Sequence, residues 1–129
     1  MRDFRVSAFD RPGKLTVVDA KSPKDGEVLL DIEACGLNFA DLLMAKGTYQ
    51  NTPELPFALG MEVCGTVSAL GPNVTAPAVG TRVAVFGGSG GLADQGLFPA
   101  ARCRVVPNAM PAEVAAGFVV AYGTSHLAL

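Results

Sequence analysis

The sequence predicts a mostly β domain, in which short antiparallel strands close into a barrel-like sheet accompanied by a few helices. Three observations lead to this prediction. Apolar and polar residues alternate in several short runs, 15 Gly and 9 Pro are spread along the chain, and helical periodicity is confined to a few segments. With 129 residues, 50% of them hydrophobic, the chain is long enough to bury a single core.

The strands are predicted from period-two alternation between turn residues. Residues 1–9 alternate, with Phe4 and Val6 on an apolar face and Asp3 and Arg5 on the opposite face, which predicts a half-buried strand. Further strands are predicted around residues 15–17, 28–34, 63–69 and 81–86, and more weakly at 92–98 and 102–106. Residues 48–57, with two prolines, are expected to form a loop.

Helical periodicity first appears after residue 38. Phe39, Leu42 and Leu43 fall on one face of a short helix. Asn38 and Asp41 have the spacing of a capping box at its start, and the glycine at position 47 suits its end. A second helical segment is predicted from residue 111, with proline at its first position, and the chain ends inside an apolar stretch with no stop signal.

Composition excludes several classes of protein. The net charge of −2 and the lack of a Lys/Arg cluster argue against nucleic-acid binding. The charged N-terminus does not resemble a signal peptide, and no apolar run approaches the length of a membrane span. Cys35, Cys64 and Cys103 are an odd, widely spaced set, which predicts free thiols in a reducing cytoplasm.

The glycine-rich segment 88–93 matches the pattern G-x-G-x-x-A and follows a predicted strand. A dinucleotide-binding turn must be followed by a helix whose N-terminus faces the pyrophosphate. Gly96 and Pro99 interrupt such a helix, and no acidic residue lies about 20 positions further on in a suitable context. We therefore interpret this segment as a loop on the rim of the sheet.

No metal site is predicted. A structural zinc ion needs four nitrogen or sulfur ligands, but the chain has one histidine, His126, three scattered cysteines and no Cys-x-x-Cys pair. His126 is interpreted as an ordinary helix residue. On chemistry alone, segment 38–49 is better explained by a capped helix and a half-buried loop aromatic, Tyr49, than by a catalytic site.

A set of short motifs nevertheless occurs in a defined order. They are N-F-A-D at 38–41, K-G-T-Y at 46–49, L-P-F at 55–57, G-M-E-V-C-G-T-V at 60–67, Gly71, G-T-R-V at 80–83, V-V-P at 105–107 and Y-G-T at 122–124. Together they resemble the medium-chain dehydrogenase/reductase superfamily, and within it the quinone oxidoreductase (zeta-crystallin-like) branch. The resemblance covers nearly the whole chain.

This resemblance implies a GroES-like, partly open β-barrel. Residues 1–107 would form the catalytic, substrate-side domain. Residues 108–129 would form a helical segment leading toward a Rossmann cofactor domain, which the chain is expected to lack because it ends inside a helix. On that view this chain alone binds NADPH weakly or not at all. Its apolar residues 118–129 are expected to be exposed and able to promote self-association.

The resemblance also implies a reaction without zinc. Zinc-dependent relatives have a cysteine ligand at the position of Asn38 and a histidine ligand at the position of Met61, and neither replacement is a good zinc ligand. The implied reaction is hydride transfer from NADPH to a quinone or an activated C=C bond (an enone). Tyr49 and Asn38 would act in catalysis, while Asn38, Asp41 and Thr124 would contact the cofactor.

Two alternatives remain open. A free-standing GroES-like module could act through protein contacts, because a fold alone does not determine function. An enzyme of the same type could instead reduce an enoyl thioester. In the favoured interpretation the partner is a small-molecule substrate, with no nucleic acid and no membrane.

Overall fold

The computed structural model describes residues 1–128 and, for residues 122–124 and 128, only the backbone. The elements of this part are β1 (Arg2–Val6), β2 (Lys14–Val17), β3 (Glu27–Gly36), α1 (Phe39–Lys46), β4 (Phe57–Ala58), β5 (Glu62–Leu70), β6 (Arg82–Phe86), β7 (Gln95–Pro99), a 3-10 turn (Ala100–Arg102), β8 (Arg104–Val105) and α2 (Ala112–Ala128). The paired strands are antiparallel. The predicted fold class, mostly β with a few helices in a partly open barrel, is confirmed.

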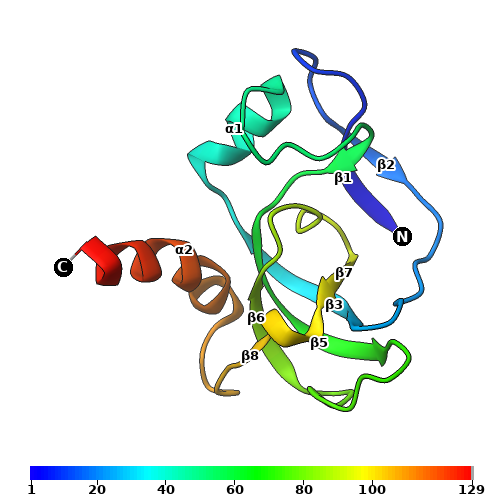
Figure 1. Cartoon of the computed structure of the whole chain (residues 1–129), viewed down its shortest axis with the longest axis vertical. Coiled ribbons are helices and arrows are strands. Elements are labelled where there is room, and N and C mark those ends of the chain that lie inside the picture. The colour runs from blue at the N-terminus through cyan, green and yellow to red at the C-terminus, as the bar shows by residue number, and fades with distance from the viewer. Residues whose placement is uncertain (129) are drawn as a thin grey trace.

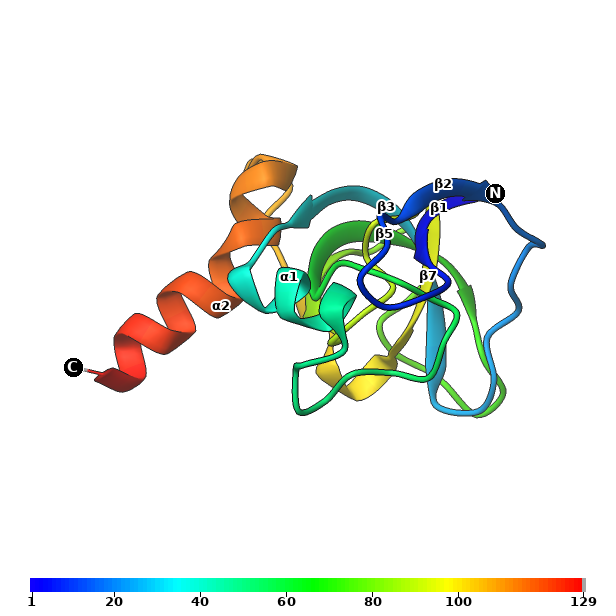
Figure 2. The ribbon, with the colours of Figure 1, turned by 90° about the horizontal axis from the view of Figure 1, so that it is seen from above.

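Two sheets build the barrel (Figure 1). Five strands pair in the order β7-β3-β5-β6-β8, and three pair in the order β2-β1-β4. The sheets meet where Asp3 forms a bridge with Ala93, and where the N–H of Phe4 donates to the carbonyl of Leu92 at 2.7 Å. α1 lies beside the barrel, and α2 leaves it on one side (Figures 1 and 2).

The main core lies inside the five-stranded sheet. Its fully buried residues come from β3, β5, β6 and β7 and are Val28, Leu30, Val63, Val67, Val83, Val85 and Phe98. They sit at alternate positions of their strands, as the period-two pattern predicts. Burying each such side chain contributes about 1.5–3 kcal/mol, so this cluster is the main reason that the barrel holds its shape.

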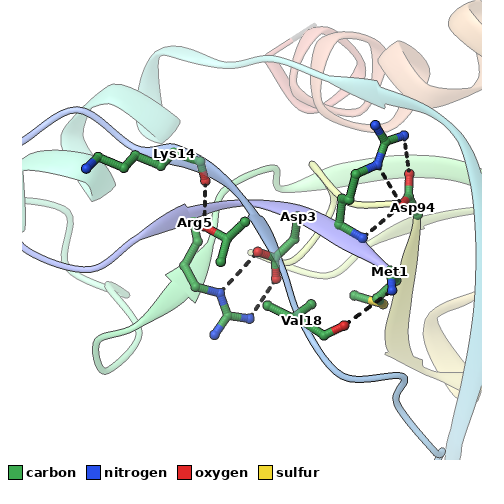
Figure 3. A network of polar contacts seen from close by, with 8 residues as sticks. Met1, Asp3, Arg5, Lys14, Val18 and Asp94 are labelled. Carbon is green, nitrogen blue, oxygen red and sulfur yellow. Dashed lines mark hydrogen bonds and ion pairs between the residues drawn. The ribbon is translucent and has the colours of Figure 1, made fainter.

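The predicted apolar face of β1 is partly wrong. Val6 is buried as expected, but Phe4 is 36% exposed and Asp3 is completely buried. Asp3 can be buried because Arg5, two residues further along the same strand, binds both of its carboxylate oxygens at 3.1 and 2.6 Å (Figure 3). The Phe4 ring instead covers Gly13, where an added Cβ would lie 2.5 Å from a ring carbon.

The capped helix at 39–46 is confirmed, but its buried face is not the predicted one. Asn38 and Asp41 form the capping box, and Gly47 ends the helix with a left-handed φ of 77°. However, Phe39 is 73% exposed and Leu42 is 60% exposed. The helix turns Asp41 inward because the Asp41 carboxylate accepts a hydrogen bond from the backbone of the adjoining segment.

α2 is anchored to the barrel at its start. Ala115 and Ala116 pack against the buried Cys64 of β5. In the preceding segment, the carbonyls of residues 107, 108 and 110 accept hydrogen bonds from the guanidinium of Arg82. Further along, Leu127 is 88% exposed, and this end of the helix projects from the barrel (Figure 2). No helix in the described residues is both long and apolar enough to cross a membrane.

The chain after β6 also differs from a dinucleotide-binding unit. Residues 87–91 form a loop, and the chain then enters β7 and pairs with β3. No helix follows the glycine-rich segment directly within the described residues, in agreement with our interpretation of it as a loop. Several boundaries differ from the prediction: β7 begins only at Gln95, residue 102 of the predicted strand 102–106 lies in the 3-10 turn, and residue 57, the end of the predicted loop, pairs with β1 in β4.

Candidate functional site

A cleft of 540 Å³ separates one end of the barrel from α2. Its lining residues are Asn38, Ala40, Tyr49, Met61 and Phe86 on the barrel side, and Val119, Val120, His126 and Leu127 on α2. A mostly apolar cleft of this size with a few polar groups is typical of small-molecule sites.

Asn38 lies between the end of β3 and the start of α1. Its extended backbone, with φ −131° and ψ 157°, makes it the N-cap residue. Its backbone N–H donates to Oδ2 of Asp41 at 2.9 Å, and its side-chain Nδ2 donates to Oε1 of Glu62 at 3.3 Å. The helix cap and the neighbouring strand together therefore fix the place of Asn38 in the cleft wall.

Asp41 lies behind this wall and is not among the residues that line the cleft. Its side chain is buried, with 5% of the residue exposed, and its Oδ1 accepts the N–H of Gly60 at 3.0 Å. Its two oxygens therefore join the start of α1 to the segment just before β5. The structure gives Asp41 a supporting position, and its predicted contact with a cofactor stays a prediction.

Tyr49 reaches the cleft from the turn that follows α1. The turn is closed by Thr52, whose N–H and Oγ1 both donate to the Tyr49 carbonyl, at 3.1 and 2.5 Å. The ring packs against a small buried cluster that includes Met44 and Met61. Tyr49 is half-buried, so the structure brings it into the same cleft as Asn38.

Met61 completes the barrel side of the cleft and is 3% exposed. Its carbonyl accepts hydrogen bonds from the N–H groups of Gly87 and Gly88, at 2.8 and 3.1 Å. The glycine-rich loop thus supports this wall through its backbone and is not among the residues that line the cleft. On α2, the exposed His126 does line the cleft, whereas the side chain of Thr124 lies outside the described residues.

Glu62 is the site residue that sequence reasoning missed. It is 3% exposed, and its Oε1 accepts from Asn38 while its Oε2 accepts from the backbone N–H of Val120 at 3.0 Å. A sequence signal did exist, because an acidic residue opens β5 and the three residues after it are apolar or glycine and buried. An acid in such a position needs hydrogen-bond partners, which here come from both sides of the cleft.

The carboxylates of Asp41 and Glu62 also affect a neighbouring thiol. Burial, followed by the negative charges of Asp41 and Glu62, raises the pKa of Cys35 from 9.0 to about 12. Neither acid belongs to any of the ion pairs found in the described part of the chain. There, no three His, Cys, Asp or Glu side chains gather closely enough to hold a metal ion.

Comparison with known proteins places the chain in a family. A family model described as the alcohol dehydrogenase GroES-like domain matches residues 24–126, and the chain belongs to this family. A curated relative, a quinone oxidoreductase-like protein 2 homolog of Nematostella vectensis, is 34% identical over 99% of this chain and 36% of its own length. The resemblance to quinone oxidoreductases of the medium-chain dehydrogenase/reductase superfamily is thereby confirmed.

Solved structures support the same family assignment. The human synaptic vesicle membrane protein VAT-1 homolog-like protein matches all of this chain and 42% of its own, with a TM-score of 0.93 and 31% identity. The quinone oxidoreductase of Thermus thermophilus, solved also as a complex with NADPH, matches with a TM-score of 0.86 and 35% identity over 40% of its length. The chain spans less than half of the length of these relatives.

Proposed function

We propose that this chain is the substrate-side domain of an NADPH-dependent oxidoreductase that transfers hydride to quinones or enones without zinc. The observation that carries the proposal is that Asn38, Tyr49 and Met61 line one cleft, although they are up to 23 positions apart (61 minus 38). The similarity to quinone oxidoreductases, one of them solved with NADPH, supports the same chemistry.

The side chains in the cleft support a reaction without zinc. Asn38 and Met61 occupy the positions at which zinc-dependent relatives are expected to carry a cysteine and a histidine. A neutral amide and a thioether bind zinc poorly compared with thiolate and imidazole. The Nδ2 atom of Asn38 is also engaged by Glu62, which leaves this amide better suited to hydrogen bonding than to metal coordination.

The proposed roles combine the placement of Asn38 and Tyr49 in the cleft with the resemblance to quinone oxidoreductases, which is the sole support for the contact of Thr124. A reduced nicotinamide bound in the cleft would supply the hydride. Asn38 holds the nicotinamide–ribose part with its amide, and Thr124 of α2 contributes a further cofactor contact. The phenol of Tyr49 stabilises negative charge on the substrate oxygen or donates a proton to it. The apolar walls suit a flat quinone or enone.

We further propose that residues 1–107 serve the substrate while residues 108–129 lead into a dinucleotide-binding domain. The greater length of the relatives supports this division. The three free thiols suit a protein of the reducing cytoplasm.

The test uses the full-length protein that carries this sequence. NADPH oxidation is measured with quinones, enones and enoyl thioesters, with and without a zinc chelator. We expect turnover of a quinone or enone that survives the chelator, and a fall in kcat of about 100-fold in Tyr49→Phe. The matched control, Phe9→Leu, changes an aromatic residue outside the cleft and should keep kcat.

Several results would count against the proposal. Activity abolished by the chelator would contradict the zinc-free reaction, and an unchanged kcat in Tyr49→Phe would remove Tyr49 from the chemistry. Turnover of enoyl thioesters alone would correct the substrate class. No NADPH oxidation with any substrate would favour a protein-binding module.

A further inference from the structure

The carboxylate of Glu62 touches both walls of the cleft. Oε1 accepts from the side chain of Asn38 on the barrel side, at 3.3 Å, and Oε2 accepts from the backbone of Val120 on α2, at 3.0 Å. Asn38 and Val120 both line the cleft, whereas Glu62 does not. One buried side chain therefore connects the two surfaces between which a ligand would lie.

The barrel is built to admit this carboxylate. Glu62 opens β5 and is paired with Gly36 of β3 on one side and with Phe86 of β6 on the other. A Cβ added to Gly36 would lie 2.5 Å from Oε1 of Glu62 and 2.8 Å from the carbonyl oxygen of Ala116 in α2. The absence of a side chain at position 36 thus lets the acid and the helix approach β3 closely.

Val120, which donates to Glu62, is the ninth of the 17 residues of α2. In Figure 2 the two ends of α2 run in different directions. A side chain that takes a backbone N–H away from the regular helical pattern is a common cause of such bends. By accepting the N–H of Val120, Glu62 contributes to the course of the helix along the cleft.

We propose that Glu62 is a positioning residue, which fixes the amide of Asn38 and holds α2 at a set place across the cleft. This proposal rests on the proposed function for its effect on the cofactor. Glu62 needs no contact with the ligand, because it acts through Asn38 and Val120. Losing a partner would leave a buried polar group unsatisfied, so the arrangement is strongly favoured.

The chemistry of a carboxylate makes the proposal testable. An ionised carboxylate only accepts hydrogen bonds, so Asn38 must turn its nitrogen toward Glu62. In Glu62→Gln, the remaining oxygen can still accept the N–H of Val120, while the new amide nitrogen faces Asn38. Asn38 must then rotate its amide and present its oxygen. This variant rotates the side-chain amide of Asn38 but keeps the hydrogen bond with Val120. Glu62→Ala loses the hydrogen bonds with both Asn38 and Val120.

The first experiment is NMR spectroscopy of the 129-residue chain and needs no activity. We expect Glu62→Gln to shift the side-chain NH₂ signals of Asn38 and to leave the Val120 amide proton nearly in place. Glu62→Ala should shift both sets of signals. The control Glu54→Gln changes an exposed acid and should shift neither. If Glu62→Gln left the Asn38 signals unchanged, or Glu62→Ala left the Val120 amide unchanged, the proposal would be overturned.

The second experiment measures steady-state kinetics of the full-length protein. Because Asn38 is assigned to cofactor binding, Glu62→Gln should raise KM for NADPH by about tenfold with a much smaller change in kcat. In an Asn38→Ala background the same substitution should add almost nothing, because both changes remove one interaction. Effects that simply add would contradict positioning through Asn38.

The two experiments separate the two proposals. If the unmodified protein does not oxidise NADPH, the proposed function fails, and the NMR spectra still decide whether Glu62 holds Asn38 and Val120. If the protein is active but the spectra do not respond to Glu62, the positioning role fails alone.

Discussion

Two regions of the molecule bury carboxylates in different ways. In the N-terminal sheet, Asp3 is completely buried, and both of its oxygens are bound by the guanidinium of Arg5 (Figure 3). Beside the cleft, Asp41 and Glu62 are almost as deeply buried, but the hydrogen bonds that hold them come from neutral N–H groups of the backbone and of Asn38. In the first region the acid is paired with a cation, and in the second region the acids accept hydrogen bonds from neutral donors alone.

The difference separates an acid that serves the fold from acids that serve a site. The Asp3–Arg5 pair lies within β1, the central strand of its sheet, and neither residue lines the cleft. Asp41 and Glu62 lie behind the cleft wall and belong to none of the ion pairs in the described residues, and burial, followed by these two acids, raises the pKa of Cys35. Hydrogen bonds to neutral donors orient such an acid without neutralising it.

The largest expected effect comes from breaking the charge-compensated pair. Arg5→Met leaves Asp3 buried without its cation, and we expect a loss of about 3 kcal/mol in the free energy of unfolding. This lies at the low end for buried pairs because the Arg5 side chain keeps 23% of its surface exposed. Urea unfolding measures the loss. The control Arg2→Met breaks the exposed pair with Asp94 and should cost much less. Equal losses of unfolding free energy in Arg5→Met and Arg2→Met would contradict the greater importance of the buried pair.

A smaller effect is expected in the region held by neutral donors. Asp41→Asn keeps the shape of the side chain but turns an amide NH₂ toward one of the two N–H groups that Asp41 now accepts, from Asn38 and Gly60. We expect a loss of about 1–3 kcal/mol in the free energy of unfolding, again measured in urea. Asp19→Asn, at an exposed position, is the matched control. If Asp41→Asn were neutral, the acid would not organise the helix start.

The effect that is smallest at neutral pH concerns Cys35, because it appears only above about pH 9. The folded thiol has a pKa of about 12, against 9.0 for an unperturbed thiol. Between these pH values the unfolded chain loses the proton and the folded chain keeps it, so this group makes stability fall as pH rises from about 9 to about 12. Alkylation of folded Cys35, followed by mass spectrometry, should therefore keep accelerating above about pH 9. A plateau just above that pH would show that the pKa of the thiol is not raised.

Asp41→Asn sharpens the same measurement. Removing one of the two negative charges should lower the pKa of Cys35, because Asp41 is the larger of the two charge contributions. The alkylation profile of the variant should then lie at lower pH than that of the unmodified chain. An unchanged profile would remove Asp41 from the causes of the raised pKa and leave burial and Glu62.

Much of the fold could be predicted from local pattern. The alternation in β3, β5 and β6 predicts which residues enter the core, because each strand has one face toward the barrel interior. The capping box and the glycine at position 47 predict the limits of α1, because both act through backbone groups close in sequence.

The failures come from contacts that the apolar pattern does not contain. Phe39 and Leu42 look like a buried helix face, yet the hydrogen bond from Gly60 to Asp41 turns a different face inward. Phe4 looks buried and Asp3 exposed until Arg5 pairs with the acid. In each case a buried polar group overrides the apolar pattern, because an unpaired acid costs more than an exposed ring.

The candidate site, like the fold, could be predicted from the sequence only in part. The resemblance to quinone oxidoreductases points to Asn38 and Tyr49, and the structure places both in one cleft. Its motif at 60–67 includes Glu62 but assigns it no role, because the contact of Glu62 is with Val120, a residue 58 positions away in the chain. Spacing along the sequence cannot reveal such a partner, because the contact exists only after α2 packs on the barrel.

Gly36 carries a consequence for the evolution of this family. A side chain at position 36 and the carboxylate of Glu62 would occupy the same space, so neither residue can be exchanged freely while the other stays. Among relatives, we expect a larger residue at position 36 to coincide with a shorter or absent acid at position 62, and with a displaced α2. Substitutions at positions 36 and 62 should therefore be correlated, although only Glu62 has a functional group in its side chain.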